Sequence, residues 1–278
     1  MIIDDLKRIL KKVPLLSRGL EIRFRYKRAT TYHSRKLKLA RTWALLQTEI
    51  SNYYYEITPR NRKDLAFLIS HILEKPLIEI EGYLTEIEND LAIQNILVDF
   101  RNSNKKMRDS NLKLGRRIGW YAIVRAFKPQ IVLETGVHHG VGSLVLTAAL
   151  KKNISEGFPG EYIGTDISTS AGVLLTEPYS SFGKILYGDS IESLKNFHTE
   201  KIDLFINDSD HSGEYEYLEY LTIIDKLSPR GIILGDNAHA TDSLRKFSEE
   251  NDRRFVFFKE EPFQHFYNGA GIGISLPN

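Results

Sequence analysis

The stretch from Pro129 to Ser143, PQIVLETGVHHGVGS, constrains the fold of this chain more than any other. Residues 131–133 form a short apolar run, which is typical of a strand buried on both faces. Glycines follow at 136, 140 and 142, and then comes LVLTAAL, an apolar segment of helical length. Strand, glycine turn and helix in this order predict the beginning of a β-α-β unit. Such glycines let backbone N–H groups approach a ligand closely at the helix N-terminus.

Strand-like and helix-like segments alternate from this stretch to the C-terminus, which predicts a mostly parallel sheet covered by helices. Only residues 260–270 separate the last two strand-like runs. That connection is too short for a typical crossover helix, so we expect those two strands to form an antiparallel pair at one edge. The seven predicted strands are at 131–134, 162–165, 185–187, 203–207, 231–235, 254–259 and 271–275.

The first 112 residues carry no catalytic pattern. We predict a helical, basic N-terminal segment and linker over residues 1–112, and a catalytic domain over residues 113–278. The segment EIRFRYKR at 21–28 alternates apolar and basic residues, and it is compatible with either a strand or a helix. Apolar residues at helical spacing predict helices at 6–13, 61–74, from 76 to about 96, and at 114–127.

The net charge of +2 conceals a strong asymmetry. Residues 1–45 hold thirteen Lys and Arg against three acidic residues, a net charge of +10, so the remaining chain carries −8. A basic arm of this kind can bind an anionic membrane surface or an acidic polymer, or it can dock on its own domain or on a second subunit. We expect no nucleic-acid partner, because nothing in the arm resembles a known nucleic-acid-binding motif. Peripheral membrane contact and a homodimer both stay open.

The chain has no cysteine, which excludes disulfides, thiolate metal sites and cysteine nucleophiles. Its first residues, MIIDDLKRILKKVP, include acids and no continuous apolar core, so they do not resemble a secretory signal. No apolar run approaches the roughly 18 residues that a membrane-spanning helix requires. We therefore expect a cytoplasmic protein.

Polar residues follow the second and third predicted strands, where ligands bind in open α/β sheets. Asp166 comes after the second strand, and a carboxylate there can accept both hydroxyls of a nucleoside ribose. Asp189 and Ser190 come after the third strand. They are compatible with a contact to the base and equally with a cap on the helix that follows.

The fourth and fifth predicted strands carry the densest group of polar residues. The segment IDLFINDSDHS places Asp208 and His211 directly after the fourth strand, and GIILGDNAHAT places Asp236 and Asn237 after the fifth. Oxygen ligands such as Asp208, Asp236 and Asn237 suit Mg²⁺ or Ca²⁺ rather than zinc.

The E-x-G-x-x-x-G-x-G pattern at 134–142 resembles the first motif of class I S-adenosylmethionine (SAM)-dependent methyltransferases. The Asp after the fourth strand and the Asp–Asn pair after the fifth resemble the metal ligands of O-methyltransferases of the catechol and caffeoyl-CoA type. The D-x-D-H-S segment is also similar to bacterial methyltransferases that act on antibiotic sugars and surface polysaccharides. The resemblance covers roughly residues 115–275, and it implies a Rossmann-like, seven-stranded sheet with an antiparallel edge hairpin.

This resemblance implies a SAM-dependent O-methyltransferase that acts on a sugar or a glycosylated natural product. The implied ligands of Mg²⁺ are Asp208, Asp236 and Asn237. The implied catalytic residues are His211, which would take the proton of the acceptor hydroxyl, and Asp208. The metal-dependent relatives have a Lys at the position of His211, so the base is a departure from their pattern. The implied SAM site comprises Glu134, Gly136, Val137, His138, Gly140, Gly142, Ser143, Asp166, Ile167, Asp189, Ser190 and Asp208.

Three alternatives stay open. The first is a metal-independent methyltransferase in which His211 is the base and Asp208 orients it. The second is a nicotinamide-dependent oxidoreductase, which the glycine spacing disfavours because the dinucleotide fingerprint is G-x-G-x-x-G. The third is a non-catalytic binding protein that acts through its basic N-terminal arm.

Overall fold

The structure is a computed structural model that describes residues 14–46, 49–51, 54–197 and 201–278. The chain divides into two compact units. One comprises Met1–Gln47 together with Gln264–Tyr267, and the other comprises Thr48–Phe263 and Asn268–Asn278. The helix predicted at 6–13 lies outside the described residues. Among the residues that are described, no helix is long and apolar enough to cross a membrane.

The smaller unit is built on the long helix α2 (Pro14–Leu46), which resolves the open assignment of residues 21–28 as helix. Nine Lys and Arg and one acidic residue lie along α2. Within this unit, the ring of Trp43 packs against Phe266 with 4.7 Å between centroids. The Nζ of Lys36 donates to the carbonyl of Tyr267 at 3.3 Å. A helix satisfies its own backbone hydrogen bonds, which a lone strand cannot do.

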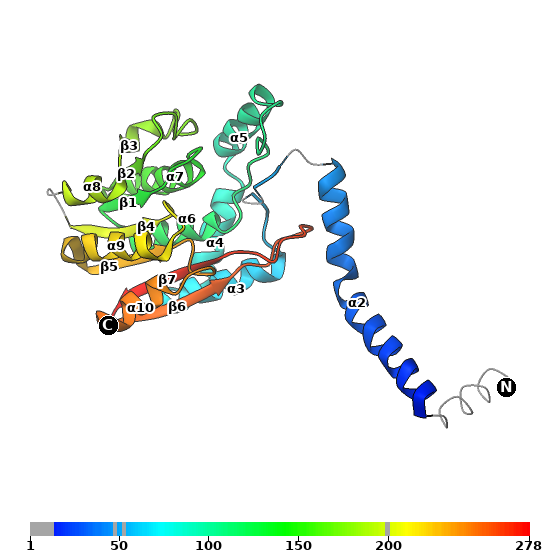
Figure 1. The fold of residues 1–278 in the computed structure, drawn as a ribbon. Coiled ribbons are helices and arrows are strands. Elements are labelled where there is room, and N and C mark those ends of the chain that lie inside the picture. The colour runs from blue at the N-terminus through cyan, green and yellow to red at the C-terminus, as the bar shows by residue number, and fades with distance from the viewer. Residues whose placement is uncertain (1–13, 47–48, 52–53, 198–200) are drawn as a thin grey trace. The chain divides into compact units, whose positions relative to one another are not determined.

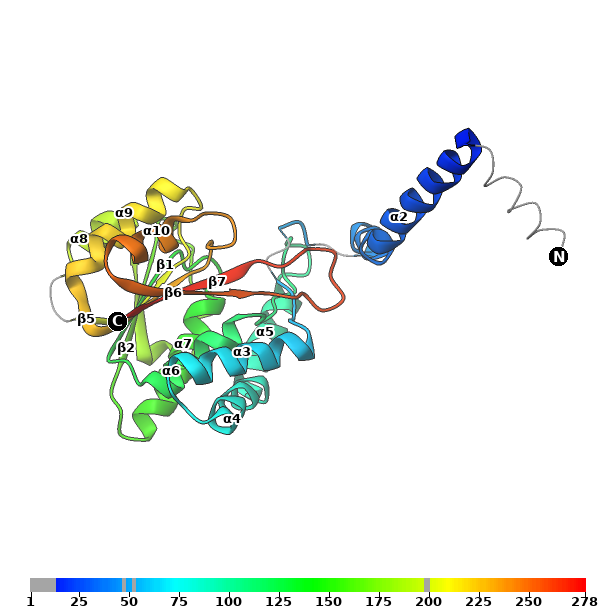
Figure 2. The same cartoon turned by 90° about the horizontal axis from the view of Figure 1, so that it is seen from below.

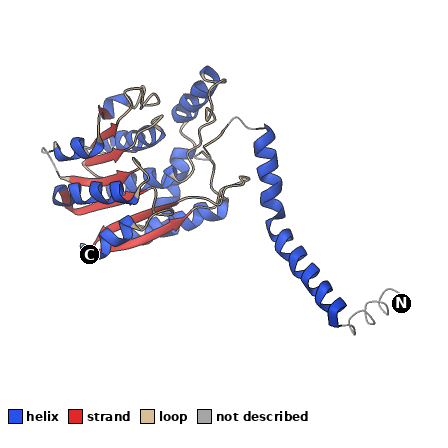
Figure 3. Ribbon diagram, viewed as in Figure 1, coloured by secondary structure: helices blue, strands red, loops and turns tan. Residues whose placement is uncertain are grey.

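The larger unit contains a seven-stranded sheet of order β3-β2-β1-β4-β5-β7-β6 (Figures 1 and 3). The first five strands are parallel, and β7 runs antiparallel between β5 and β6. The predicted fold class, the seven strands and the antiparallel edge pair are confirmed. The strands are β1 (Ile131–Thr135), β2 (Glu161–Asp166), β3 (Gly183–Tyr187), β4 (Ile202–Asn207), β5 (Leu227–Gly235), β6 (Arg253–Lys259) and β7 (Gly271–Pro277).

Helices cover both faces of the sheet (Figure 2). On one side lie α3 (Pro59–Ile72), α4 (Leu77–Glu88), α6 (Arg117–Phe127) and α7 (Val141–Ser155). On the other lie α8 (Ser190–Lys195), α9 (Gly213–Ile223) and α10 (Ser243–Glu250). The remaining elements are α5 (Leu91–Ser103) and the short 3₁₀ helices η1 (Ser180–Phe182) and η2 (Ile224–Lys226).

The predicted helix from 76 to about 96 is two helices, because Asp90 begins a new one. Its Oδ1 accepts hydrogen bonds from the backbone of Ala92 at 2.9 Å and of Ile93 at 3.2 Å. A side chain that caps the first orphan N–H groups in this way fixes a helix N-terminus. The break lies between Glu88 and Leu91, the bounds of α4 and α5.

The core has two halves, one on each face of the sheet. In β1, Val132 packs in the half under α6 and α7, while Ile131 and Leu133 pack in the half under α8, α9 and α10. This alternation explains why the strand reads as continuously apolar, since both of its faces are covered.

Helices α3 and α4 pack on α6, which is buried along almost its whole length. Their apolar stripes, including Leu65 and Leu84, are fully buried in the same core as Trp120 of α6. The structure therefore divides the chain at Gln47/Thr48, whereas the sequence predicts a boundary at residue 112. An apolar stripe needs a covering partner, and for α3 and α4 that partner is α6.

Candidate functional site at the carboxyl edge of the sheet

Three backbone hydrogen bonds align the strand ends just beyond the sheet. The amide of Gly136 donates to Thr165 at 2.9 Å, that of Asp208 to Thr135 at 2.9 Å, and that of Asp236 to Asn207 at 3.0 Å. These bonds continue the register from β2 across β1 and β4 to β5. The segments predicted to bind ligand therefore lie side by side at the carboxyl edge of the sheet.

The turn between β1 and α7 has no room for a side chain at its first glycine. Gly136 has a φ of +83°, and a Cβ there would lie 1.9 Å from the carbonyl oxygen of Asp208. Gly140 has a φ of +89° and forms the N-cap of α7 without a side-chain cap. The turn thus presents bare backbone and the uncapped N-terminus of a helix, which is a site for polar and anionic groups of a ligand.

Asp166 lies beside this turn with both carboxylate oxygens fixed. Its Oδ2 accepts from the amide of His138 at 2.8 Å, and its Oδ1 accepts from the amide of Ser168 at 2.8 Å. Each oxygen keeps a further lone pair for a ligand hydroxyl. The neighbouring Ile167 is exposed.

Two of the predicted cofactor residues lie beneath the turn. Glu134 is 1% exposed, and the hydroxyl of Tyr162 donates to its Oε2 at 2.5 Å. The Oγ of Ser143 lies 2.7 Å from the same hydroxyl. Burial raises the pKa of Glu134 to about 7. Glu134 and Ser143 therefore support the turn from inside, and Val137 is buried as well.

The two histidines of the turn face aromatic residues. The Nδ1 of His138 lies 3.0 Å from the hydroxyl of Tyr54, and His139 packs against Phe100 with 5.4 Å between ring centroids. Burial, together with His138, lowers the pKa of His139 to about 4. Next to His139 is a pocket of about 560 Å³, lined by residues of α5, of the segment that follows it and of the loop after β2, including Ile96, Phe100, Met107, Val173 and Leu174.

Asp189 caps a helix, as one of the two sequence interpretations expects. Its Oδ1 accepts from the amide of Glu192 at 2.9 Å, and its Oδ2 accepts from the hydroxyl of Tyr215 at 2.9 Å. The Oγ of Ser190 lies 2.9 Å from the same tyrosine hydroxyl. A base contact by these residues stays a prediction.

A buried arginine holds the predicted metal ligand Asp236. The Nε of Arg116 donates to Asp236 Oδ1 at 2.6 Å, and its Nη2 donates to Oδ2 of the same carboxylate. The Nη1 lies 3.4 Å from Oε2 of Glu260, which also accepts from the hydroxyl of Tyr55 at 2.8 Å. Arg116, Asp236 and Glu260 are at most 6% exposed.

A second arginine faces Asp208. The Nη2 of Arg117 lies 3.7 Å from Asp208 Oδ2, and its guanidinium lies over the rings of Tyr54 and Trp120. Burial, with the nearby carboxylate of Asp236, raises the pKa of Asp208 well above its usual range. Burial alone would also raise the pKa of Asp236, but Arg116 holds it below its usual range.

These contacts do not fit the predicted divalent ion. Both oxygens of Asp236 already accept from Arg116. The third predicted ligand, Asn237, is directed to the buried carboxylate of Glu216 in α9. Burial raises the pKa of Glu216, and hydrogen bonds from the Thr241 hydroxyl and the Asn237 amide partly offset that rise. Within the described parts of the chain, no group of three His, Cys, Asp or Glu is placed to hold a metal.

His211 lies in the exposed loop between β4 and α9. It is on the same edge of the sheet as Asp208, but no hydrogen bond joins the two among the described residues. The nearby carboxylate of Asp210 instead accepts from the amide of Ser212 at 2.7 Å, which orders the loop. The pairing of His211 with Asp208 therefore stays a prediction.

One buried carboxylate, Glu219 of α9, joins several elements behind the site. Its Oε2 accepts from Thr135 at 2.9 Å and from the amide of Asn207, and its Oε1 accepts from Ser209 at 2.8 Å and from Ser190. These donors come from the ends of β1 and β4 and from α8. Sequence reasoning missed this residue because a Glu on a helix reads as exposed.

Sequence reasoning also missed the residues that surround Asp236 and Asp208. Arg116, Arg117, Glu260 and the tyrosines at 54 and 55 come from three distant parts of the chain. The only local signal is a pair of adjacent arginines directly ahead of an apolar helix, in the segment GRRIGW.

Residues 133–238 match the family described as "Methyltransferase domain". This segment is similar to methyltransferase domains. The match contains the glycine turn, Asp166, Asp208 and Asp236, so the resemblance to class I SAM-dependent methyltransferases is confirmed. No curated protein sequence is significantly similar to the chain.

Solved structures share the fold of the methyltransferase domain. A putative O-methyltransferase from Klebsiella pneumoniae has a TM-score of 0.53 at 15% identity, covering 68% of this chain and 91% of that one. The O-methyltransferase TomG from Streptomyces achromogenes, involved in tomaymycin synthesis and solved with SAM, has a TM-score of 0.52 at 15% identity, covering 68% and 91%. An O-methyltransferase from Bacillus cereus, solved with S-adenosylhomocysteine (SAH), has a TM-score of 0.51 at 14% identity, covering 71% and 99%.

Proposed function

We propose that this chain is a SAM-dependent O-methyltransferase. The observation that carries the proposal is the glycine turn with Asp166 beside it. Gly136 leaves bare backbone where a Cβ would meet Asp208, and Asp166 offers two oriented oxygens. Two proteins of the same fold, from Streptomyces achromogenes and Bacillus cereus, were solved with SAM and SAH.

These residues fit SAM. When bound, SAM supplies an electrophilic methyl group. Asp166 would accept hydrogen bonds from the ribose hydroxyls, and the turn from Gly136 to Gly140 would allow the backbone to approach the cofactor closely. Rate enhancement then depends mainly on holding the acceptor in line with the methyl group.

The acceptor is a hydroxyl of a small molecule, a sugar or a natural product. Three neighbours of this fold are described as O-methyltransferases, one of them in natural-product synthesis. The pocket beside His139, at about 560 Å³, has the size of a small-molecule site. His211 on the exposed loop removes the proton of the acceptor hydroxyl, since an imidazole can act as a base near neutral pH.

The first test is calorimetric titration of the full chain with SAH. We expect micromolar binding, weakened at least tenfold by Asp166→Ala and unchanged by Asp242→Ala, a matched carboxylate that is exposed on the surface. Absence of SAH binding to the unaltered protein contradicts the proposal.

A second test addresses the base. Methyl transfer from labelled SAM to a panel of sugar and phenolic acceptors is measured across pH 5–9 in the unaltered protein and in His211→Gln. We expect SAH affinity to stay the same and transfer to fall about 10²–10⁴-fold. An unchanged pH profile in the variant would assign the proton transfer to another group.

The role of the basic arm is a separate proposal. Helix α2 carries nine basic residues and exposes Phe24, Tyr26 and Leu45. This combination suits contact with an anionic membrane surface or with a second copy of the chain. Deleting residues 1–45 tests the arm, because SAH binding by the remaining chain should persist.

A further inference from the structure

The position of Arg116 against the predicted metal ligands carries one further inference, which rests on the proposed methyltransferase function. Arg116 directly precedes α6, and its planar guanidinium meets Asp236 with two parallel hydrogen bonds, one of them at 2.6 Å. This bidentate geometry is the strongest pairing that an arginine makes with a carboxylate. It places a positively charged guanidinium on both oxygen atoms of a carboxylate that was predicted to bind a metal.

The cluster already contains two positive charges, which leave a net charge of −1 against its three carboxylates. Three buried carboxylates, Asp208, Asp236 and Glu260, face the two guanidiniums of Arg116 and Arg117. The two arginines supply the same charge of +2 as one Mg²⁺. Adding a divalent ion to the intact cluster would place excess positive charge among groups that are at most 14% exposed in their side chains, and burying unpaired charge is strongly unfavourable.

Further contacts hold Arg116 in this place. Its Nη1 lies 3.4 Å from Glu260, and Glu260 is fixed by the hydroxyl of Tyr55 at 2.8 Å. That hydroxyl also accepts from the amide of Ala270 at 3.0 Å, next to β7. A side chain anchored on both β5 and the β6–β7 connection does not swing away to admit an ion.

We infer that the guanidinium of Arg116 takes the place of the divalent cation at Asp208 and Asp236, so that methyl transfer by this chain needs no metal ion. Arg116 is a positioning residue: it fixes the charge and the orientation of Asp236. Because an arginine stays protonated at all physiological pH values, this cation cannot be removed by a chelator.

The test measures binding of Mn²⁺ to the full chain by electron paramagnetic resonance. The unaltered protein should bind no stoichiometric Mn²⁺ at about 0.1 mM, a concentration that would saturate a site with a Kd of about 1 μM. Arg116→Ala leaves Asp208 and Asp236 without their cation, and hard oxygen ligands then attract a divalent ion. We expect this variant to bind one Mn²⁺ at least tenfold more tightly than the unaltered protein, and Asp236→Asn in the same chain to abolish the gain.

The matched control is Arg125→Ala. Arg125 lies at the other end of α6, is also buried, and also pairs with two carboxylates, Glu86 and Glu156. The Arg125→Ala variant should gain no Mn²⁺ site, because the carboxylates of Glu86 and Glu156 are partly exposed to solvent. Arg116→Gln is the milder variant for the event that Arg116→Ala does not fold.

Two results would overturn the inference. One is stoichiometric Mn²⁺ binding by the unaltered protein that Asp236→Asn removes. The other is a folded Arg116 variant with no gain in Mn²⁺ affinity. SAH titration in the presence of EDTA is run in parallel on each protein. Absence of SAH binding both with and without EDTA would contradict the proposed function, whereas SAH binding that is lost only in EDTA would contradict the inference about Arg116.

Discussion

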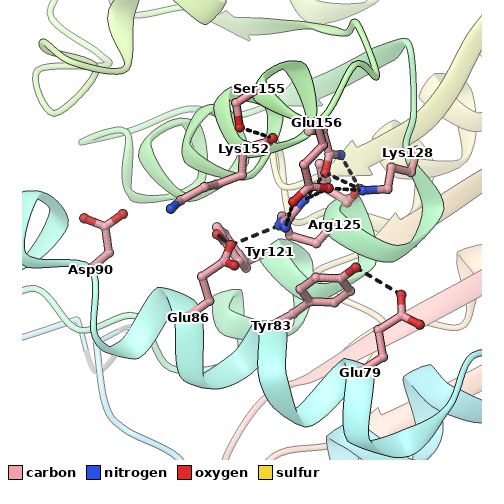
Figure 4. Close-up of polar contacts among 12 residues, drawn as sticks. Glu79, Tyr83, Glu86, Asp90, Tyr121, Arg125, Lys128, Lys152, Ser155 and Glu156 are labelled. Atoms are coloured by element: carbon pink, nitrogen blue, oxygen red, sulfur yellow. Dashed lines mark hydrogen bonds and ion pairs between the residues drawn. The ribbon is translucent and has the colours of Figure 1, made fainter.

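Two buried arginines at opposite ends of the same helix differ in whether the polar groups around them can complete their hydrogen bonds. Arg125, in the last turn of α6, donates to Glu86 at 3.0 Å, to Glu156 at 2.5 Å and to Asn153 at 2.5 Å (Figure 4). Its carboxylate partners are 31% and 42% exposed in their side chains, so water completes their hydrogen bonding. Arg116, just ahead of α6, has partners that are at most 7% exposed.

The arginine at the carboxyl edge of the sheet is surrounded by polar atoms that lack partners. The Nε of Arg117 and the Oε1 of Glu260 are buried and form no hydrogen bond with the described residues. No buried atom around Arg125 is of this kind among those residues. A buried polar atom without a partner is costly, so it persists where a ligand or the chemistry of a site requires it. The difference supports the proposal that the Arg116 end belongs to the site, whereas the contacts of Arg125 only join helices.

The largest expected difference between the two ends is in stability. Arg116→Ala leaves a buried carboxylate pair uncompensated and should lower the free energy of unfolding by about 3–5 kcal/mol. Arg125→Ala frees carboxylates that water can reach, and we expect a loss of about 1–2 kcal/mol. Urea denaturation of both variants measures the difference. Equal losses of stability in the two variants would show that the solvent exposure of the carboxylate partners makes no difference.

Opposite pH dependences should separate the buried Glu134 from the exposed Glu156. Burial raises the pKa of Glu134 to about 7, so the folded state favours its protonated form. Its contribution to stability is therefore greatest below about pH 4.5 and declines as the pH rises to about 7, by up to about 3 kcal/mol. Glu134→Gln should be more stable than the unaltered protein at pH 8, with the gap closing toward pH 5. Thermal melts at both pH values check this, and a gap of the same size at pH 5 and pH 8 would argue against an ionisable Glu134.

The third comparison uses two glycines with the same backbone conformation. Gly136, at the carboxyl edge, has a φ of +83°, and Gly157, after the C-terminus of α7, has a φ of +88°. A Cβ at Gly157 meets nothing within 4 Å, whereas one at Gly136 would lie 1.9 Å from a backbone oxygen. Gly157→Ala should cost only the left-handed strain, about 1 kcal/mol, and Gly136→Ala about 2–3 kcal/mol. Calorimetry should also show SAH affinity reduced at least tenfold by the Gly136 variant alone.

The smallest expected effect is at Glu156. Hydrogen bonds from Arg125 and Lys128 lower the pKa of Glu156 to about 2. Its contribution to stability is present above about pH 4.5 and is lost as the pH falls toward 2, opposite in sign to Glu134. Because Glu156 is 42% exposed, we expect less than about 1 kcal/mol. Melting temperatures of Glu156→Gln and of the unaltered protein should differ at pH 6 and converge near pH 2.5.

The sheet could be predicted from the sequence because the pattern of apolar residues that marks a strand lies within the strand itself. The run at 131–133 is apolar on both faces, and Gly136 marks the turn where only a glycine fits. The extent of the helices was harder to predict. The break at Asp90 depends on a single capping side chain, and the helical state of residues 21–28 could not be decided from a pattern that alternates along the chain.

The site could be predicted only where its residues adjoin a strand end. Asp166, Asp208 and Asp236 each follow a strand, so their convergence at one edge follows from parallel topology. Their charge state does not follow, because it depends on Arg116 and Glu260, which lie 144 positions apart in the sequence. No local pattern records such a contact, and so the sequence predicted a metal ion where the structure places an arginine.

The hydrogen bonds of Glu219 have a consequence for how the carboxyl edge opens. Four side-chain donors, from Thr135, Ser190, Asn207 and Ser209, converge on this one carboxylate. Separating any one of these segments removes a hydrogen-bond donor from the buried carboxylate. The segments are therefore expected to open together rather than one at a time. In native-state hydrogen exchange, the amides at the ends of β1 and β4 should then exchange with one common free energy, although 72 positions separate Thr135 and Asn207 in the chain.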